Sequence, residues 1–396
     1  MEMKNYSVGF ARLDITPPLD VTMIGAGPRK TKGVLDPLYV NAIAFGGEDK
    51  SAVILVCDLL GMYGSFGDTW PGEIAEKLGL DKESVFVHCT HTHTGPNPNA
   101  DKEYLAWMFR RLCDAAQMAL DDRKPVVDVQ WAQGMTEGLI YTRRYLMRDG
   151  RIETHPPAGN TGNSDIVRHY CSVADETIRL VRFTREGGRE IALINTQTHP
   201  DTVGGEYVSA DWPGAVRDRI EKEHPEVDCI YMNGCQGQLV TGTKFNPHVP
   251  KSHQKGMEFG NKVAEAALPL FDKTVSTGMT GIGYAQKVHS LKSVPTKAHP
   301  EPPEFWDMIV SVITFCGVGI AGMCGEPFCE VGEYVRERSK YPVSFVCCQT
   351  NGARGYLPLE EAYGLPGRNY EANTARLAPG GTEIMMETAV ELLNNN

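Results

Sequence analysis

Apolar segments of strand length alternate with segments of helix length along almost the whole chain. The hydrophobic pattern predicts a strand that begins at 85 and further strands at 7–18, 38–45, 52–57, 126–131, 178–183, 191–196, 228–232, 281–288, 309–324 and 343–348. It predicts helices at 71–78, 101–120, 212–223, 256–270, 331–339 and 382–393. Because the two kinds of element alternate, we expect an α/β fold in which mixed β-sheets are flanked by helices.

The composition is that of a soluble globular protein. The chain has 396 residues, of which 41% are hydrophobic and 22% charged, and this length suits one large domain or two ordinary ones. The net charge of −11 argues against a nucleic-acid partner, because a phosphate backbone selects clustered Lys and Arg. No apolar stretch reaches the ~18 residues of a membrane span, so we expect no membrane partner either.

Cysteine usage and the N-terminus bear on the compartment. The eleven cysteines are scattered through apolar segments, and no Cys-x-x-Cys pair occurs. A cysteine-rich zinc site is therefore not expected, and thiols kept reduced in a core suit the cytoplasm. The first residues lack the apolar segment of a signal peptide. The sequence thus predicts a cytoplasmic protein.

The segment 85–96 is the most informative for function. Val85, Val87 and Cys89 share one face of an extended chain, and if the extension continues, His91 and His93 fall on that face too. Two such imidazoles could share one metal ion, or one could bind the metal while the other carries a proton. Each could also be an ordinary hydrogen-bonded core histidine.

Other polar clusters also follow predicted strands, which is where α/β proteins usually build their sites. His199 and Asp201 follow the strand 191–196, and Asp211 precedes a helix, where it could be an N-cap. Glu326 follows the apolar stretch that ends near 324, where an unpaired carboxylate would be costly. Two His and one Glu from separate strands form a known type of catalytic zinc set.

Ordered sequence blocks show a family resemblance. They are Val8–Pro17, His91–Pro96, Thr198–Pro200 with Ser209–Gly214, Asn233–Gly237, Gly325–Glu326, and Gly355–Tyr356 with Tyr370–Glu371. Taken together, the chain resembles the catalytic domain of the neutral/alkaline (non-lysosomal) ceramidase family from residue 8 to about 380. The resemblance implies a single catalytic domain over 1–396, without the C-terminal β-rich domain of the secreted ceramidases.

The resemblance also assigns roles to residues. It implies one Zn²⁺ ion, with another divalent metal as the alternative, held by His91, His199, Glu326 and Tyr356. His93 would act as acid and base. Arg143, in the long polar loop 142–165, would line the site and orient substrate. We expect Asp201 and Tyr370 to join Arg143 in binding the substrate.

One block departs from the family. The ceramidases carry Gly-Asp-x-Ser-Pro with the serine at the metal centre, whereas this chain places Gln238 at the Asp position and Val240 at the serine position. A valine can neither donate a hydrogen bond nor share a proton, so the ceramidase mechanism cannot transfer whole. Thr241 or Thr243 could supply a hydroxyl nearby.

These observations predict a zinc-dependent hydrolase that uses metal-activated water to cleave an amide, or an ester, in a soluble small molecule. Two alternatives remain open. One is a metal-dependent lyase or isomerase that acts on a polar, sugar-derived substrate. The other is a non-catalytic binding homologue that has kept the pocket, which Gln238 and Val240 would favour.

Overall fold

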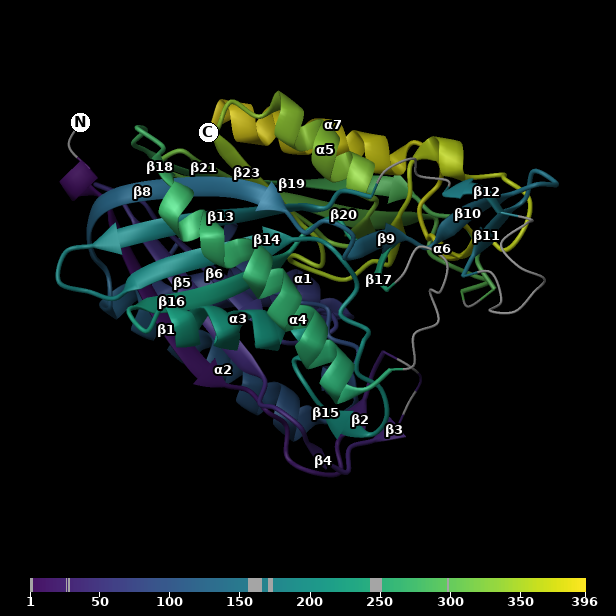
Figure 1. Cartoon of the computed structure of the whole chain (residues 1–396), viewed down its shortest axis with the longest axis horizontal. Helices are drawn as coiled ribbons and strands as arrows, with labels where there is room; N and C mark the ends of the chain where they lie inside the picture. Colours follow the sequence, from purple (N-terminus) through teal and green to yellow (C-terminus); the bar gives the residue numbers. More distant parts are fainter. Residues whose placement is uncertain are drawn as a thin grey trace.

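Two β-sheets pack face to face, and helices cover the outer face of each (Figure 1). The computed structural model describes residues 3–155 except 26 and 28, 166–169, 174–242, and 251–396 except 298. Residues 156–165 of the predicted long loop and Thr243 lie outside the described residues. The fold class is confirmed: the sheets are mixed, and helices flank them.

The larger sheet has nine strands among the described residues. In spatial order they are β16 (Val227–Asn233), β14 (Glu190–Thr196), β13 (Thr177–Arg185), β8 (Lys124–Met135), β1 (Ser7–Asp14), β5 (Tyr39–Gly46), β6 (Ser51–Cys57) and β7 (Val85–Cys89), with β18 (Val275–Ser276) paired to β8. Most neighbours are antiparallel, but β14 pairs with β16 and β6 pairs with β7 in parallel.

The smaller sheet runs β19 (Ile282–Lys292), β20 (Phe305–Phe315), β21 (Val318–Met323) and β23 (Val343–Cys347). The single strand predicted at 309–324 is wrong, because the apolar stretch folds back as the hairpin β20–β21. Cys316 and Gly317 form its two-residue turn with φ of 45° and 87°. Two positive φ values are what such a turn requires, and glycine adopts one of them without strain.

Six α-helices of the described chain cover the sheets. They are α1 (Ser65–Leu78) and α2 (Lys102–Asp121) on one half of the larger sheet, α3 (Asp211–Glu223) and α4 (His253–Ala267) on its other half, and α5 (Cys329–Arg338) and α7 (Gly381–Asn395) on the smaller sheet. A short helix, α6 (Tyr370–Thr374), lies near the short strands described below. The four layers are visible in Figure 1.

Helix starts agree only partly with prediction. Asp101 caps α2 as expected, since its side chain accepts the N–H groups of Glu103 and Tyr104. Helix α1 was predicted to begin at Pro71, where proline is favoured, but it begins six residues earlier. Phe66 and Trp70 explain the difference: their rings pack at 4.9 Å and extend the buried face of the helix.

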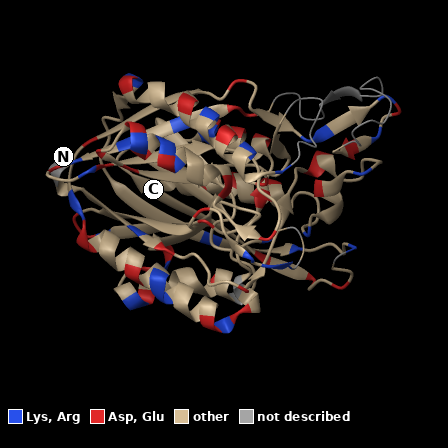
Figure 2. Ribbon diagram, turned by 60° about the horizontal axis from the view of Figure 1, so that its bottom comes forward, with Lys and Arg blue, Asp and Glu red and all other residues tan. Residues whose placement is uncertain are grey.

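The space between the sheets is an aromatic and aliphatic core. The rings of Phe45, Phe183 and Phe315, from strands of both sheets, lie 4.7 to 6.1 Å apart. Such contacts add to the free energy gained from burying apolar surface. Figure 2 shows that charged residues are concentrated on the helices and loops, with few on the strands between them. In the described part of the chain, no helix is both long and apolar enough to cross a membrane.

Four short strand pairs and one small three-stranded sheet assemble at one end of the two large sheets. They are β2 (Thr22–Met23) with β3 (Arg29–Lys30), β4 (Gly33–Val34) with β15 (Tyr207–Val208), β9 (Ile140–Thr142) with β17 (Leu239–Thr241), β22 (Glu326–Pro327) with β24 (Tyr356–Leu357), and β10 (Arg144–Met147) with β11 (Ile152–Thr154) and β12 (Ile166–His169). The pair β22–β24 sets Glu326 beside Tyr356, and β9 ends directly before Arg143.

A buried ion pair joins the two halves of the larger sheet. Nη1 of Arg217, on α3, lies 3.0 Å from Oδ2 of Asp58, which follows β6, and their side chains are 3% and 0% exposed. Asp58 also accepts the backbone N–H of Tyr39 and the hydroxyl of Thr90. The carboxylate is thereby satisfied from three directions.

We predict that Arg217→Met destabilises the protein by about 3–5 kcal/mol, because it leaves the Asp58 charge buried without its cation. Chemical denaturation would measure the change. The matched control is Arg219→Met in the same helix, since Arg219 makes a half-exposed i,i+4 pair with Glu223 that contributes at most about 0.5 kcal/mol. Equal stability of the two variants would contradict the prediction.

Candidate metal centre

The candidate ligands sit just beyond the carboxyl ends of strands in both sheets. His91 follows β7, His199 follows β14, and Glu326 follows β21. Backbone hydrogen bonds hold these ends together: Cys89 N donates to Gln349 O, and Gln349 N donates to Gly325 O. The sheet packing therefore places groups from distant parts of the sequence within a few ångströms of each other.

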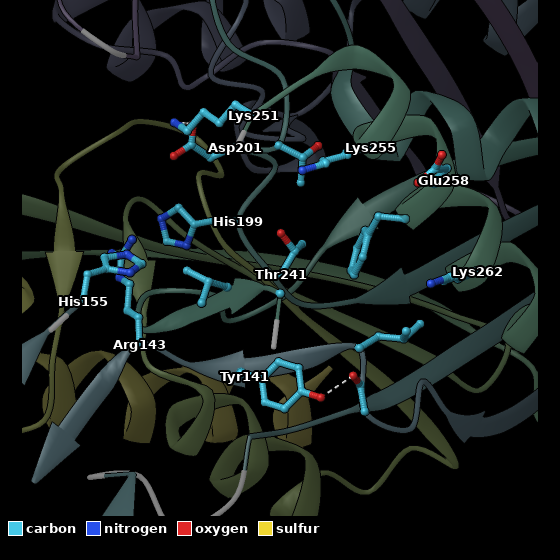
Figure 3. Close-up of a pocket in the computed structure, with 16 residues that line it drawn as sticks. Tyr141, Arg143, His155, His199, Asp201, Thr241, Lys251, Lys255, Glu258 and Lys262 are labelled. Carbon is cyan, nitrogen blue, oxygen red and sulfur yellow. Dashed lines mark hydrogen bonds and ion pairs between the residues drawn. The ribbon is translucent and has the colours of Figure 1, made fainter. Parts of the chain in front are cut away.

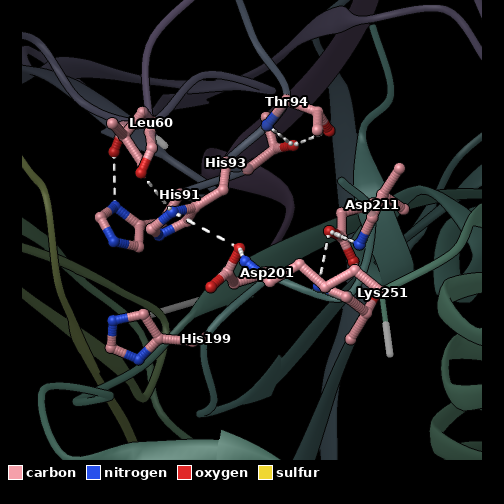
Figure 4. A network of polar contacts seen from close by, with 12 residues as sticks. Leu60, His91, His93, Thr94, His199, Asp201, Asp211 and Lys251 are labelled. Atoms are coloured by element: carbon pink, nitrogen blue, oxygen red, sulfur yellow. Dashed lines mark hydrogen bonds and ion pairs between the residues drawn. The ribbon is translucent and has the colours of Figure 1, made fainter. Parts of the chain in front are cut away.

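The expected extension through His91 and His93 does not occur. Strand β7 ends at Cys89, and His91 adopts a left-handed conformation with φ of 75°. This kink is held by the bond from His91 N to Leu59 O. The two imidazoles still meet, with ring centroids 4.9 Å apart at 88° (Figure 4). The pair is built by a turn rather than by strand alternation.

Hydrogen bonds fix which ring nitrogen of each histidine faces the centre. His91 Nδ1 lies 2.6 Å from Leu60 O, and His199 Nδ1 lies 2.9 Å from Leu239 O. A carbonyl oxygen only accepts, so each Nδ1 carries the hydrogen and each Nε2 keeps its lone pair. Backbone carbonyls commonly orient metal-binding imidazoles in this way.

Glu326 completes a compact group of donor atoms. Its Oε2 lies 3.5 Å from His91 Nε2 and 3.2 Å from His199 Nε2. Ligand atoms bound tetrahedrally to zinc lie about 3.3 Å from one another, given bonds of about 2.0–2.1 Å. Both distances from Glu326 Oε2 therefore fit ligands of one small ion.

Several of these atoms are buried without a partner. His93 Nε2, His199 Nε2 and Glu326 Oε2 have no hydrogen-bond partner among the described residues. Burying such groups unsatisfied is costly, and native proteins rarely tolerate it. A metal ion would satisfy His199 Nε2 and Glu326 Oε2 together, and His93 Nε2 as well if His93 is a ligand, so the donor set fits a metal on chemical as well as geometric grounds.

The protonation states suit metal binding. Burial alone would raise the pKa of Glu326, but His91 and His199 lower it well below its usual range. Burial, reinforced by the charge of Arg143, lowers the pKa of His199. A carboxylate and a neutral imidazole are the forms that bind metals.

His93 lies close enough to belong to the same group. One ligand atom each from His91, His93 and His199 can be chosen so that all three lie within 4.8 Å of one another. His93 Nδ1 is 3.2 Å from Gly25 O and 3.7 Å from Asp201 Oδ1. Two ligand sets are therefore open: three histidines, or two histidines with Glu326.

Tyr356 and Arg143 stand beside this group. Tyr356 is the register partner of Glu326 in the pair β22–β24, and its ring lies 6.4 Å from that of His199. Arg143 Nη2 donates to the Tyr356 hydroxyl at 2.9 Å, and Arg143 Nε donates to Glu371 at 2.5 Å. Burial raises the pKa of Tyr356 well above its usual value.

Glu371 and Gln349 are site residues to which sequence reasoning gave no role. Glu371 is completely buried and also accepts the Thr154 hydroxyl. Gln349 donates to Glu326 Oε1 at 3.2 Å. The only sequence signal for Glu371 was its place in the Tyr370–Glu371 block, and Gln349 had none.

Gln238 and Val240, the residues that depart from the ceramidase motif, lie in two different environments. Gln238 faces α5, where it accepts the backbone N–H of Cys329 and donates to Glu330 at 2.6 Å, so it stands outside the centre. Val240 and Thr241 instead line the cavity beside His199. Thr241 therefore brings a hydroxyl to the cavity, whereas Val240 offers only methyl groups.

Asp211, for which the sequence left an N-cap role open, is the first residue of α3, after Ala210. It is fully buried with φ of 59°, and it accepts the N–H groups of Thr202 and Val203. It thereby shapes the turn that follows His199. Burial raises the pKa of Asp211 more than these hydrogen bonds lower it, so the pKa lies at about 6.

A cavity of about 660 Å³ opens beside the centre (Figure 3). Its wall includes three predicted site residues, Arg143, His199 and Asp201. Asp201 is partly exposed and pairs with Lys251 (Figure 4). Tyr370 is about half exposed, and its ring lies 5.7 Å from that of Tyr356. The structure thus gathers the predicted site residues into one region.

We predict that the purified protein binds about one equivalent of Zn²⁺ and that His199→Ala weakens this affinity by more than about a hundredfold. Competition with a chromogenic chelator would measure it. The control is His224→Ala, because His224 is half-buried and stacks on Phe271 away from the centre. Metal binding that is equal in wild type and His199→Ala would contradict the prediction.

His93→Ala separates the two ligand sets. We expect this variant to keep its zinc affinity within about tenfold of wild type if Glu326 is the third ligand. A loss as large as that of His199→Ala would show that the three histidines bind the ion.

Comparisons with known proteins agree with the observed fold. No family model matches the chain, and no curated protein matches its sequence. Among solved structures, a ceramidase complexed with C2 matches with a TM-score of 0.78 and 12% identity, over 98% of this chain and 75% of that one. The neutral ceramidase from Pseudomonas aeruginosa matches with a TM-score of 0.78 and 13% identity, over 98% and 74%. The expected likeness is confirmed, and the chain has the fold of the neutral ceramidase catalytic region.

Proposed function

We propose that this chain is a zinc-dependent hydrolase that cleaves an amide, or an ester, in a soluble small molecule. The observation that carries the proposal is that His199 Nε2 and Glu326 Oε2 are buried without a hydrogen bond and lie 3.2 Å apart, with His91 Nε2 3.5 Å from the same carboxylate oxygen. His199 also lines a cavity large enough for a small substrate. The two solved structures described above are ceramidases, which supports amide hydrolysis as the reaction class.

In this proposal His91, His199, Glu326 and Tyr356 hold one zinc ion. Mixed imidazole and oxygen ligands suit zinc among the common divalent ions. When bound, zinc would polarise a carbonyl group and lower the pKa of water. The spacing of the Nε2 and Oε2 atoms supports three of these ligands, and the strand register beside Glu326 supports Tyr356.

His93 is the proposed proton carrier. Burial lowers the pKa of its imidazole to about 3, against the opposing charge of Asp201, so the ring is neutral at pH 7. Its Nδ1 faces Gly25 O and the carboxylate of Asp201, which leaves Nε2 as the accepting atom. Asp201 would stabilise the imidazolium once it forms.

Arg143 is the proposed substrate-orienting residue, with Asp201 and Tyr370 as further contacts. Burial alone would lower the pKa of Arg143, but Tyr356 and Glu371 raise it, so the guanidinium keeps its charge. Nε and Nη2 are occupied, whereas no hydrogen bond joins Nη1 to the described residues. Nη1 is thus available for a carbonyl oxygen of the substrate.

Val240 favours a second candidate, a metal-dependent lyase or isomerase. The valine lines the cavity at the position of the ceramidase serine, so no hydroxyl from that position assists hydrolysis. A neutral imidazole beside a metal centre could instead remove a proton next to a carbonyl. A sugar-derived uronate would be the substrate to try.

The decisive experiment compares wild type with His93→Ala on N-acyl compounds and on uronates. For a hydrolase, we expect wild type to release the amine from N-acyl compounds, and His93→Ala to lower kcat/KM by about 10²–10⁴-fold. Zinc content measured on the same samples shows whether the ion is retained. Activity on uronates alone would establish the second candidate, and ligand binding without turnover in either variant would establish a binding protein.

A further inference from the structure

The cavity wall away from the metal centre carries positive charge. Four cationic side chains and two carboxylates line the cavity, although the whole chain has a net charge of −11. Two of the cations, Lys255 and Lys262, belong to α4 and stand seven residues apart, so they lie on the same face of that helix. Figure 3 shows Lys262 and Glu258 across the drawn region from His199 and Arg143.

The other two cations are already paired with carboxylates. Arg143 pairs with the buried Glu371 at 2.5 Å, and Lys251 pairs with Asp201. By contrast, neither Lys255 nor Lys262 has a side-chain hydrogen bond or ion pair with the described residues. The positive charge open to a ligand is therefore that of these two lysines.

Glu258, the carboxylate nearest to Lys255 and Lys262 in the sequence, forms no ion pair that would offset their charge. Glu258 lies between the two lysines on α4, but no ion pair within 4.0 Å joins it to either, and its Oε1 accepts the side-chain amide of Gln254 at 2.8 Å. The helix thus presents two cations and one carboxylate to the cavity.

Apolar groups lie in the same wall. Phe259, which also comes from α4, packs at 5.3 Å against the ring of Trp212, and Leu139 and Val240 line the cavity as well. A ligand that reaches from the metal centre to the lysines would contact apolar side chains on the way. Such a wall suits a short hydrocarbon linker.

We propose that the substrate is an N-acyl compound whose amine portion carries a carboxylate, and that Lys255 and Lys262 bind this carboxylate. The inference rests on the proposed function, since it takes the cavity to be the substrate site. Lys255 and Lys262 act as specificity-determining residues, because they bind a group remote from the bond that is cleaved. Their charge also attracts anions to a cavity in an otherwise acidic protein.

Matched substrates test the charge alone. The probes are N-acetyl-4-aminobutyrate and N-acetyl-8-aminooctanoate, each beside its primary amide, which has nearly the same shape and no charge. With the zinc-loaded protein, we expect kcat/KM for at least one carboxylate to exceed that of its amide by about tenfold or more. We also expect this preference to shrink as the salt concentration rises.

The variants are Lys255→Gln, Lys262→Gln and the double substitution, with Lys222→Gln on α3 as the control outside the cavity. We expect the double variant to raise KM for the carboxylate about tenfold, to leave kcat within about twofold, and to leave the amide unaffected. The control should match wild type on every compound. Circular dichroism would confirm that each variant is folded.

Calorimetric binding of the same compounds separates this inference from the proposed function. Carboxylate binding that depends on the two lysines, without turnover of any compound, would refute the hydrolase and sustain only the carboxylate-binding role of Lys255 and Lys262. Equal hydrolysis of acids and amides by wild type and the double variant would overturn the inference and sustain the hydrolase. Failure to bind either carboxylate would also overturn the inference.

Discussion

The candidate centre depends most on the hydrogen bonds that the side-chain amide of Asn233 donates. Asn233 ends β16, and its Nδ2 donates to Thr90 O at 3.1 Å and to Thr198 O at 3.3 Å. These carbonyls belong to the residues directly before His91 and His199. One buried amide thus fixes the spacing of both imidazoles, and a small displacement of it would move two candidate ligands at once. Because the amide is buried, breaking either bond would leave a polar group without water.

A second buried group extends this constraint to the other sheet. His88 Nδ1 lies 2.8 Å from Cys348 O on the smaller sheet, and its Nε2 accepts the backbone N–H of Asn233. Burial lowers the pKa of His88 to about 4, so the imidazole stays neutral and can donate with one nitrogen while accepting with the other. This histidine is a structural link between the sheets, whereas His91, three residues later, faces the centre. Histidines so close in sequence take different roles because the backbone turns between them.

The limits of sequence reasoning follow from the same geometry. The fold class and the placement of His91, His199 and Glu326 after strands could be predicted, because hydrophobic periodicity marks strands and polar residues mark their ends. The kink at His91 could not be predicted, because the positive φ of this non-glycine residue depends on a tertiary contact, the hydrogen bond from His91 N to Leu59 O. Glu371 was missed for a similar reason: its partner Arg143 is 228 residues away, and no local pattern announces a pair of that separation.

The fold and the cavity carry different information about function. The aromatic core and the strand-end ligands are properties of the scaffold, and they would be the same for many substrates. The cavity wall depends on the side chains that this chain places there. Val240 offers only methyl groups beside His199, while Lys255 and Lys262 bring positive charge to the wall. If the cavity is the substrate site, as proposed above, these features favour a compact, charged molecule over a neutral lipid amide. Under that proposal, the residues that select the substrate lie on α4 and β17 rather than among the candidate ligands of the metal.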